Sequence, residues 1–504
     1  MAKFTRKNAW DQNGTFDNPD LLWYAKAVGV MQSRALNDEN SWWFFAAMHG
    51  EQMGGSEFPN WNVLPGLPNV PTTPLPDTAT INKYWNQCQH QSWYFAPWHR
   101  GYLIALEEQI REAVISLGGP ADWALPYWNY LGPDDQYKIP PAFTEKNLPD
   151  GTLNPLYVTA RYGPKNNGNI YIEIPPISEA CQGNTIYTGS NSSTSLPGYG
   201  GPETKFSHDG RVSGNLESNP HNLVHVQVGG QDGLMSDPDS AGLDPIFYLH
   251  HCNIDRMWAS WNVKNHNPIN PMWLGGPALY GEREFIMPLP NNKAWVYTPG
   301  EMTSLARLDY TYDDLAPTTA PLLEKTLSQR LTKLGAKSVV TETLQEQNMN
   351  LGSNSELVGA NAGQVQIDGS GIKTTVKLES SSWKNVPNSL MKASASSLPD
   401  QVYLQLENVK GTKDANILKV SVNHQLAGHV SLFGLRNASH NDGHNAGNGL
   451  TFILNITEII DNLYINNKLD IDSLDVTILP DNAIAADEKI TVGRVSIYRE
   501  EQKL

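Results

Sequence analysis

The spacing of apolar residues changes from a helical to a strand period past the middle of the chain. Apolar residues recur at helical intervals over residues 21–31 and 102–117, and long connections rich in Pro, Gly and Asn separate such stretches. From about residue 364 onward, apolar and polar residues alternate, as in Gln401-Val-Tyr-Leu-Gln-Leu, between turns rich in Asn, Asp and Gly. The pattern predicts a mainly α-helical first part with large loops, followed by an antiparallel β-sandwich or barrel.

The distribution of tryptophan indicates the same division. Fourteen of the 15 tryptophans lie before residue 300, and only Trp383 lies beyond it. The run Leu315-Ala-Pro-Thr-Thr-Ala-Pro is typical of a linker, and an amphipathic stretch follows it near residues 322–334. A chain of 504 residues is long enough for two or three domains, each with its own core.

Charge and hydropathy exclude some classes of protein. A net charge of -16 argues against a nucleic-acid backbone as partner, because neutralising phosphates requires a basic face. We expect no membrane span, since no run of about 18 apolar residues occurs. No secretory signal is visible behind the basic start of the chain, so we expect a cytoplasmic protein, with export on a partner protein left open. The three cysteines cannot all pair with one another, and in a reducing cytosol none needs to.

One group of histidines has the spacing of metal ligands. His221 and His225 stand at positions i and i+4, which places both imidazoles on one face of a helix. Alone this pattern is weak, and Asn222 stands where a zinc peptidase has its glutamate. His251 supplies a third imidazole, and Asp255, one helical turn further on, is placed to accept a hydrogen bond from its second ring nitrogen. Three imidazoles without a thiolate suit copper, or zinc with an open position.

A second group lies about 150 residues away in equally aromatic surroundings. His90 and His99 are nine residues apart, and a turn through Pro97 with a helix opening at His99 would bring them together. His49 ends the apolar run Ser41-Trp-Trp-Phe-Phe-Ala-Ala-Met and is the remaining candidate. Three plus three imidazoles predict two metal ions.

These segments resemble those of the type-3 copper proteins, which are the tyrosinases, catechol oxidases and molluscan haemocyanins. The resemblance rests on C-x-H followed by F-A-P-W-H-R-x-Y-L-x-x-L-E at residues 88–107, on H-N-x-x-H at 221–225, and on D-P-I-F-Y-L-H-H-x-N-x-D-R at 244–256. It implies a helical-bundle domain with two copper ions. The implied ligands are His49, His90 and His99 for the first copper, and His221, His225 and His251 for the second.

The resemblance extends to the domain boundaries. Arg6 and the run Tyr310-Thr-Tyr312 are similar to the arginine and tyrosine pair with which this family closes its catalytic domain. It therefore implies a catalytic domain at residues 1–315, a linker at 316–334 and a β-rich domain at 335–504. The last resembles the carboxy-terminal domain that lies over the copper site in plant and some fungal and bacterial relatives.

The resemblance also implies a reaction, in which molecular oxygen is used to hydroxylate a small monophenol at the ortho position and to oxidise o-diphenols to o-quinones. Glu217 and Asn222 match positions where hydroxylating relatives orient a water molecule, and Cys88 matches a cysteine joined by a thioether to the second histidine, here His90. Val226 would form one wall of the substrate pocket. Pro238, thirteen residues before His251, corresponds to a gate residue.

Three alternatives remain open at this point. The chain could be a catechol oxidase or o-aminophenol oxidase without hydroxylase activity, or an oxygen carrier of the haemocyanin type. A mononuclear zinc hydrolase does not explain six histidines in two aromatic segments. The sequence predicts neither the natural substrate nor the oligomeric state.

Overall fold

The computed structural model describes residues 3–51, 61, 70–189, 196–206, 212–316, 323–336, 355–394, 396–441, 446–485 and 488–502. The chain forms two compact units. Unit 1 comprises Met1–Gln182, Thr204–His208 and Leu216–Thr318, and unit 2 comprises Gly183–Glu203, Asp209–Asn215 and Thr319–Leu504. Within the described residues, no helix has the length and apolar character needed to cross a membrane.

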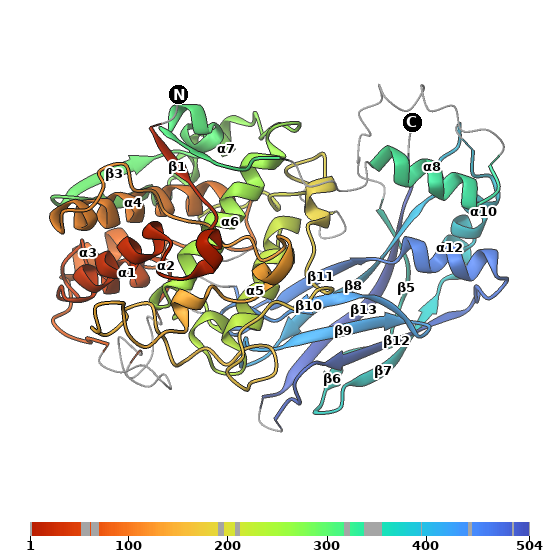
Figure 1. Cartoon of the computed structure of the whole chain (residues 1–504). Coiled ribbons are helices and arrows are strands. Elements are labelled where there is room, and N and C mark those ends of the chain that lie inside the picture. Colours follow the sequence, from red (N-terminus) through yellow and green to blue (C-terminus); the bar gives the residue numbers. More distant parts are fainter. Residues whose placement is uncertain are drawn as a thin grey trace. The chain divides into compact units, whose positions relative to one another are not determined.

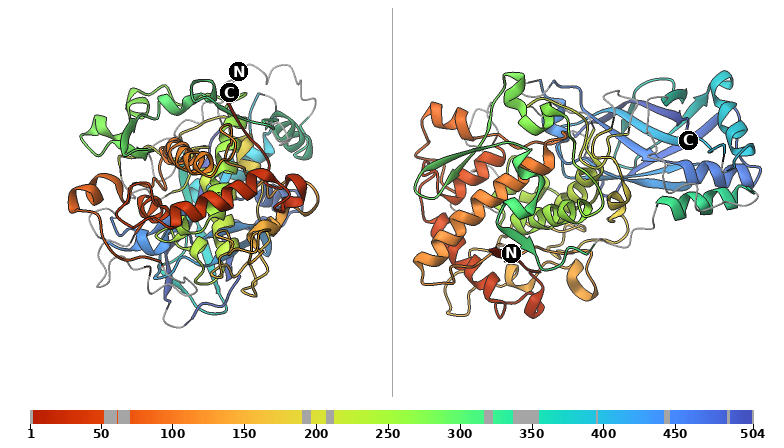
Figure 2. Two further views of the ribbon diagram at one scale, coloured as in Figure 1. Left: turned by 60° about the vertical axis from the view of Figure 1, so that its left-hand side comes forward. Right: turned by 90° about the horizontal axis from the view of Figure 1, so that it is seen from above.

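Unit 1 consists of helices joined by long connections, as the helical periodicity predicted (Figure 1). Its longest helix, α4, packs against both α1 and α6 (Figure 2). The α-helices among its described residues are α1 (Pro19–Gln32), α2 (Trp42–His49), α3 (Thr78–Tyr84), α4 (Phe95–Ser116), α5 (Asn222–Gly229), α6 (Ile246–Trp261) and α7 (Pro271–Gly275).

Side-chain caps fix where the first helices begin. Asn18 accepts a hydrogen bond from the backbone N–H of Asp20, and Pro19 occupies the first position of α1, where its missing N–H has no cost. Ser41 caps α2 in the same way, and Asp77 caps α3. The cap at Ser41 sets the start of the helix that ends at His49.

The two ends of unit 1 meet in a short parallel ladder. Strand β1 (Phe4–Arg6) pairs with β4 (Tyr310–Tyr312), with Arg6 opposite Tyr312. Arg6 is fully buried and donates to the Tyr312 hydroxyl over 2.9 Å, so the predicted pairing of arginine and tyrosine is present. The only other sheet among the described residues of unit 1 is the antiparallel hairpin β2 (Phe285–Leu289) and β3 (Lys293–Tyr297).

Unit 2 is built on an antiparallel sheet (Figure 1). Along the strand Ser473–Pro480, for example, buried residues alternate with partly exposed ones, as the period-two pattern predicted. Where the sequence predicted a sandwich or barrel, the strands form one nine-stranded sheet, in which eight strands follow the order β10-β9-β12-β7-β5-β13-β8-β11 and the ninth, β6, pairs with β13. The strands are β5 (Ser355–Ala360), β6 (Val365–Ile367), β7 (Ile372–Leu378), β8 (Gln401–Lys410), β9 (Ile417–Val422), β10 (Gln425–Ser431), β11 (Leu450–Asn455), β12 (Ser473–Pro480) and β13 (Ile490–Glu500).

Helices complete the core of unit 2, and one of them changes the interpretation of the linker. Residues 323–333 form helix α8 (Leu323–Lys333), whose Arg330 donates to both carboxylate oxygens of Asp461 and to the carbonyl of Asp400. The end of the predicted linker 316–334 is therefore part of unit 2, and residues 317–322 lie outside the described residues. The other helices are α9 (Ser380–Trp383), α10 (Asn385–Met391), α11 (Leu435–Ser439) and α12 (Thr457–Ile465).

Candidate metal centre

Three histidines from two helices bring their Nε2 atoms together in unit 1. His221 ends a π-helical turn at Glu217–His221, His225 lies one turn later on α5, and His251 lies on α6. Nε2 of His251 lies 3.2 Å from Nε2 of His221 and 3.3 Å from Nε2 of His225. All three side chains are fully buried.

These distances fit a metal ion bound by the three nitrogens. Imidazole nitrogens at about 2.0–2.1 Å from a tetrahedral metal ion lie roughly 3.3 Å apart. Each neutral imidazole offers only one N–H, so three buried nitrogens that face one another cannot all be satisfied by mutual hydrogen bonds. A cation at their centre satisfies all three lone pairs.

The protein fixes the tautomer of four of the imidazoles. Because a carbonyl or amide oxygen can only accept a hydrogen bond, each facing Nδ1 must carry the hydrogen, and Nε2 is left with a lone pair for a metal. Nδ1 lies 2.8–2.9 Å from a backbone carbonyl oxygen in three of them: that of Pro238 for His49, of Phe95 for His99 and of Met235 for His225. In His221, Nδ1 lies 2.8 Å from the side-chain Oδ1 of Asn222.

The other predicted group is assembled from three segments. His49 is the last residue of α2, His90 lies in the connection before α4, and His99 lies near the start of α4. Together with Cys88 they can place one ligand atom each within 4.8 Å of one another. The centroids of the His90 and His99 rings are 5.8 Å apart, and all four side chains are buried.

Two phenylalanines pack between the imidazoles of both groups. The ring centroid of Phe247 lies 4.7 Å from that of His49 and 4.1 Å from that of His251. The ring centroid of Phe95 lies 4.6 Å from that of His99 and 4.7 Å from that of His221. These apolar contacts hold the imidazoles in a dry environment, and the sequence predictions did not include them.

Burial keeps the imidazoles neutral. Desolvation, together with neighbouring imidazoles, lowers the pKa of His99, His221, His225 and His251 well below the usual value. Neutral imidazole is the form that binds a metal, so the site favours a cation at its centre over protons.

Cys88 lies against the edge of the His90 ring. Its Sγ atom is 3.6 Å from Nδ1 and 3.7 Å from Nε2 of His90, so it faces the side of the ring where Cε1 joins the two nitrogens. Sγ also lies 3.4 Å from Nε2 of His99. Burial and the nearby Glu217 carboxylate raise the pKa of the thiol.

Glu217 is a buried carboxylate attached to the segment that carries His90. It is 1% exposed, and both of its oxygens lie 2.9 Å from the backbone N–H of Gln91. Gln91 has a φ of 50°, in the left-handed region that residues other than glycine seldom adopt. No sequence pattern marks this conformation, and Gln91 was not predicted as a site residue.

Comparison with known proteins places this site in a family. The model of the common central domain of tyrosinase matches residues 39–264, and a domain of unknown function, DUF7868, matches residues 354–500. The chain is 30% identical to tyrosinase HcTyr1 of Hahella sp. (strain CCB-MM4) over 98% of its own length and 99% of that protein. The chain belongs to the tyrosinase family.

Other relatives of this tyrosinase-family protein match over different lengths. Polyphenol oxidase E of Solanum lycopersicum is 30% identical over 38% of this chain and 34% of that protein. The solved structure of latent apple tyrosinase shares the fold, with a TM-score of 0.56 and 20% identity over 99% of this chain and 98% of that chain. Latent aurone synthase gives a TM-score of 0.57 with 19% identity over 100% and 90% of the two chains. The two histidine groups fit the type-3 dicopper site of the tyrosinase family.

Two adjacent histidines on α6, His250 and His251, have different surroundings. His251 points its Nε2 at His221 and His225, whereas both ring nitrogens of His250 have no hydrogen-bond partner among the described residues. The His250 ring stacks on that of His221 with centroids 5.3 Å apart, and it lies 5.6 Å from that of Tyr130. His250 also has a ring nitrogen within 4.8 Å of ligand atoms of His221, His225 and His251, so the choice of His251 as the ligand stays a prediction, which the short distances between Nε2 atoms support.

Asp255 does not orient His251, contrary to the sequence prediction. One oxygen accepts from Arg100 Nε over 2.5 Å, and the other accepts from Arg6 and from the hydroxyls of Tyr310 and Tyr312. Nδ1 of His251 has no partner among the described residues. Two buried guanidinium groups attract the carboxylate more strongly than a neutral imidazole does, so Asp255 joins the network that closes unit 1.

Neither of the two predicted pocket residues is tested by the structure. Pro238 is buried, and its carbonyl accepts a hydrogen bond from Nδ1 of His49, so its backbone supports a predicted ligand, and its role as a gate stays a prediction. Val226 is 3% exposed on α5, directly after His225, and its role as a pocket wall stays a prediction.

Proposed function

We propose that this protein is a tyrosinase in the narrow sense, which hydroxylates monophenols at the ortho position and oxidises o-diphenols to o-quinones. The family acts on phenolic substrates with oxygen. The relative that matches almost the whole chain is named a tyrosinase, which supports the hydroxylating activity.

Bound copper ions would supply the electron transfer between the phenol and oxygen. His49, His90 and His99 would hold one ion, and His221, His225 and His251 the other. The protein contributes lone pairs of fixed direction, through hydrogen bonds from Nδ1 to oxygens, and apolar walls at Phe95 and Phe247.

The buried Glu217 carboxylate is the observation that carries the hydroxylase assignment. A phenol has a pKa near 10, so a monophenol must give up a proton before its oxygen can bind a metal at neutral pH. Glu217 lies beside the His90 segment, held by the N–H of Gln91, and would accept this proton directly or through one water molecule. Asn222 orients His221 through a 2.8 Å contact from its Oδ1 to Nδ1, and so contributes to the same end of the site.

Oxidation of catechols without hydroxylation is the second candidate. Catechol oxidase B of Solanum tuberosum is 30% identical over 38% of this chain, a match similar to that of polyphenol oxidase E. A catechol oxidase would use the same histidines and would not need Glu217 as a proton acceptor.

The proposed role of residues 335–504 is to cover the copper site. Two structural relatives that extend over nearly the whole chain are described as latent, which supports this role. A thioether between Cys88 and His90 is proposed as well, and the 3.6–3.7 Å approach of Sγ to both nitrogens of the ring is the geometry that precedes such a bond.

A comparison of rates tests the hydroxylase assignment. Copper-loaded protein is assayed with a monophenol and separately with the matching catechol, alongside Glu217→Gln and the exposed control Glu145→Gln. We expect both substrates to react, and Glu217→Gln to slow the monophenol much more than the catechol. Turnover of catechol with none of monophenol contradicts the assignment and favours the catechol oxidase.

A further inference from the structure

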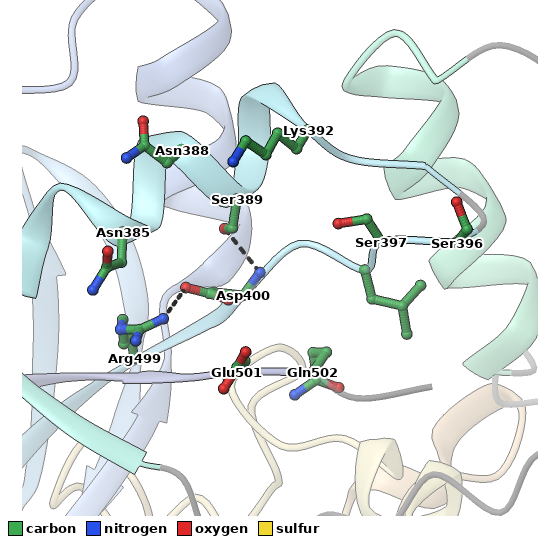
Figure 3. A pocket seen from close by; sticks show the side chains of 11 residues that line it. Asn385, Asn388, Ser389, Lys392, Ser396, Ser397, Asp400, Arg499, Glu501 and Gln502 are labelled. Atoms are coloured by element: carbon green, nitrogen blue, oxygen red, sulfur yellow. Dashed lines mark hydrogen bonds and ion pairs between the residues drawn. The ribbon is translucent and has the colours of Figure 1, made fainter.

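Unit 2 contains a polar cavity at one end of its sheet (Figure 3). Its volume is about 470 Å³, within the range of roughly 300–1,000 Å³ that is usual for small-ligand sites. Amides, hydroxyls and charged groups line it, and Leu398 is the only apolar residue among the lining side chains. This lining suits a hydrophilic ligand and excludes a phenol or another largely apolar molecule.

The floor of the cavity is held rigidly. Arg499 donates from Nε to Glu356 over 2.6 Å and from Nη1 to Asp400 over 2.8 Å. The backbone N–H of Asp400 donates to Ser389, whose hydroxyl donates to the carbonyl of Val386. These bonds join α10, the start of β8, the end of β13 and β5, so the cavity is formed before any ligand binds.

The two sides of the cavity carry opposite charges. Lys392 lies at the end of α10, and Glu501 follows β13 on the other side of the cavity (Figure 3). Neither has an ion-pair partner among the described residues. Burial raises the pKa of Asp400, and repulsion from the Glu501 carboxylate raises it further. These two carboxylates therefore lie close enough to repel each other. One side therefore offers an unpaired cation and the other an excess of negative charge.

We propose that this cavity binds a small zwitterion of the amino-acid or dipeptide class. The ligand carboxylate would bind Lys392 and the amide of Asn388, and the ligand ammonium would bind Glu501 and Asp400. A ligand that carries both charges makes favourable electrostatic contacts with both sides of the cavity. The positive charges of Lys392 and Arg499 balance the negative charges of Asp400 and Glu501, and a zwitterion preserves this balance because it has no net charge. Nine of the eleven lining residues lie within residues 354–500, which match the domain of unknown function, and the proposed binding does not depend on the copper chemistry.

Calorimetric titration of the full-length chain with glycylglycine tests the proposal. N-Acetylglycylglycine lacks the ammonium and glycylglycinamide lacks the carboxylate, so each retains one of the two charges. We expect glycylglycine to bind, and each analogue to bind roughly fivefold or more weakly, as the loss of one partly exposed charge pair predicts.

Variants then assign the binding to this cavity. Lys392→Met and Glu501→Gln alter exposed side chains and should each weaken glycylglycine by the same factor, whereas the exposed control Lys410→Met should not. Glycylglycinamide lacks the carboxylate that Lys392 would bind, so Lys392→Met should leave the already weak binding of this analogue unchanged. The proposal is overturned if glycylglycine does not bind, if both analogues bind as tightly as it does, or if neither cavity variant weakens it.

Discussion

Replacing Asp255 with asparagine separates two accounts of this residue. In the structure its carboxylate accepts from Arg6, Arg100, Tyr310 and Tyr312, and it makes no contact with His251. Asparagine keeps the size of the side chain, removes the charge and replaces one acceptor oxygen with an NH2 donor. We expect Asp255→Asn to destabilise unit 1 and to leave the copper affinity of the folded protein unchanged.

The size of the effect follows from burial. The side chains of Arg6, Arg100 and Asp255 are 0%, 1% and 2% exposed, so the small values typical of surface ion pairs do not apply. Removing one partner of a buried pair costs about 3–5 kcal/mol, because the remaining charge stays in a medium that solvates it poorly. Arg6 retains Glu107 as a partner and Arg100 retains the carbonyl of Met302, so we expect about 3 kcal/mol.

The dependence of this effect on pH has a definite sign. Burial alone would raise the pKa of Asp255, but Arg100 and Arg6 outweigh it and hold that pKa below the usual value. A lowered pKa stabilises the fold at every pH above the unfolded value, and this contribution is lost as pH falls through the folded value. Wild type and Asp255→Asn should therefore differ most near neutrality and converge in strong acid.

Denaturant unfolding followed by tryptophan fluorescence measures the effect, since fourteen of the 15 tryptophans lie before residue 300. Asp135→Asn, in the exposed pair with Lys138, is the matched control and should change nothing measurable. Copper affinity is measured on the folded variant by competition with a chelator. If Asp255→Asn is as stable as the wild type but binds copper roughly 10–100-fold more weakly, this account is refuted, because that is the result expected if Asp255 orients His251.

Three further predictions concern the chemistry of the site and its access. Glu217→Gln should lower the ratio of monophenol to catechol rates, and an unchanged ratio would remove Glu217 from the reaction. Copper-loaded protein should yield a peptide mass in which Cys88 and His90 together lack two hydrogen atoms, and Cys88→Ser should abolish this loss; an unmodified mass in the active wild type would exclude the thioether. Cleavage between Asp314 and Leu323 should raise the rate on bulky phenols while copper is retained, and an unchanged rate on every phenol tested would exclude a covering role.

The sequence predicted that His221, His225 and His251 come together because the spacings that matter on their helices are local. His221 and His225 are one turn apart on a single helix, and the His-His pair lies on another, so the helical period determines which imidazoles can face one another. The division into a helical and a strand-rich part was predictable for the same reason, since apolar periodicity reports local structure.

The contacts around the ligands were not predictable, because they come from residues distant in sequence. Asp255 has the spacing to meet His251, but Arg6 and Arg100 approach it from 249 and 155 residues away. The carbonyl of Pro238 reaches His49 across 189 residues, and Gln91 acts through its backbone conformation, which its side chain does not encode. Helix α8 was assigned to a linker because its attachment through Arg330 also depends on residues far along the chain.

Metal analysis of the full-length protein tests the central claim most directly. After copper loading and removal of loosely bound ions, two clusters of potential ligands, with three predicted imidazole ligands in each, lead us to expect two copper ions per chain. His251→Ala should reduce the content to one, because it removes one of three nitrogens that lie 3.2–3.3 Å apart, whereas the first group keeps its ligands. A single zinc ion and no copper in the wild type, or two tightly bound copper ions in His251→Ala, would contradict the account.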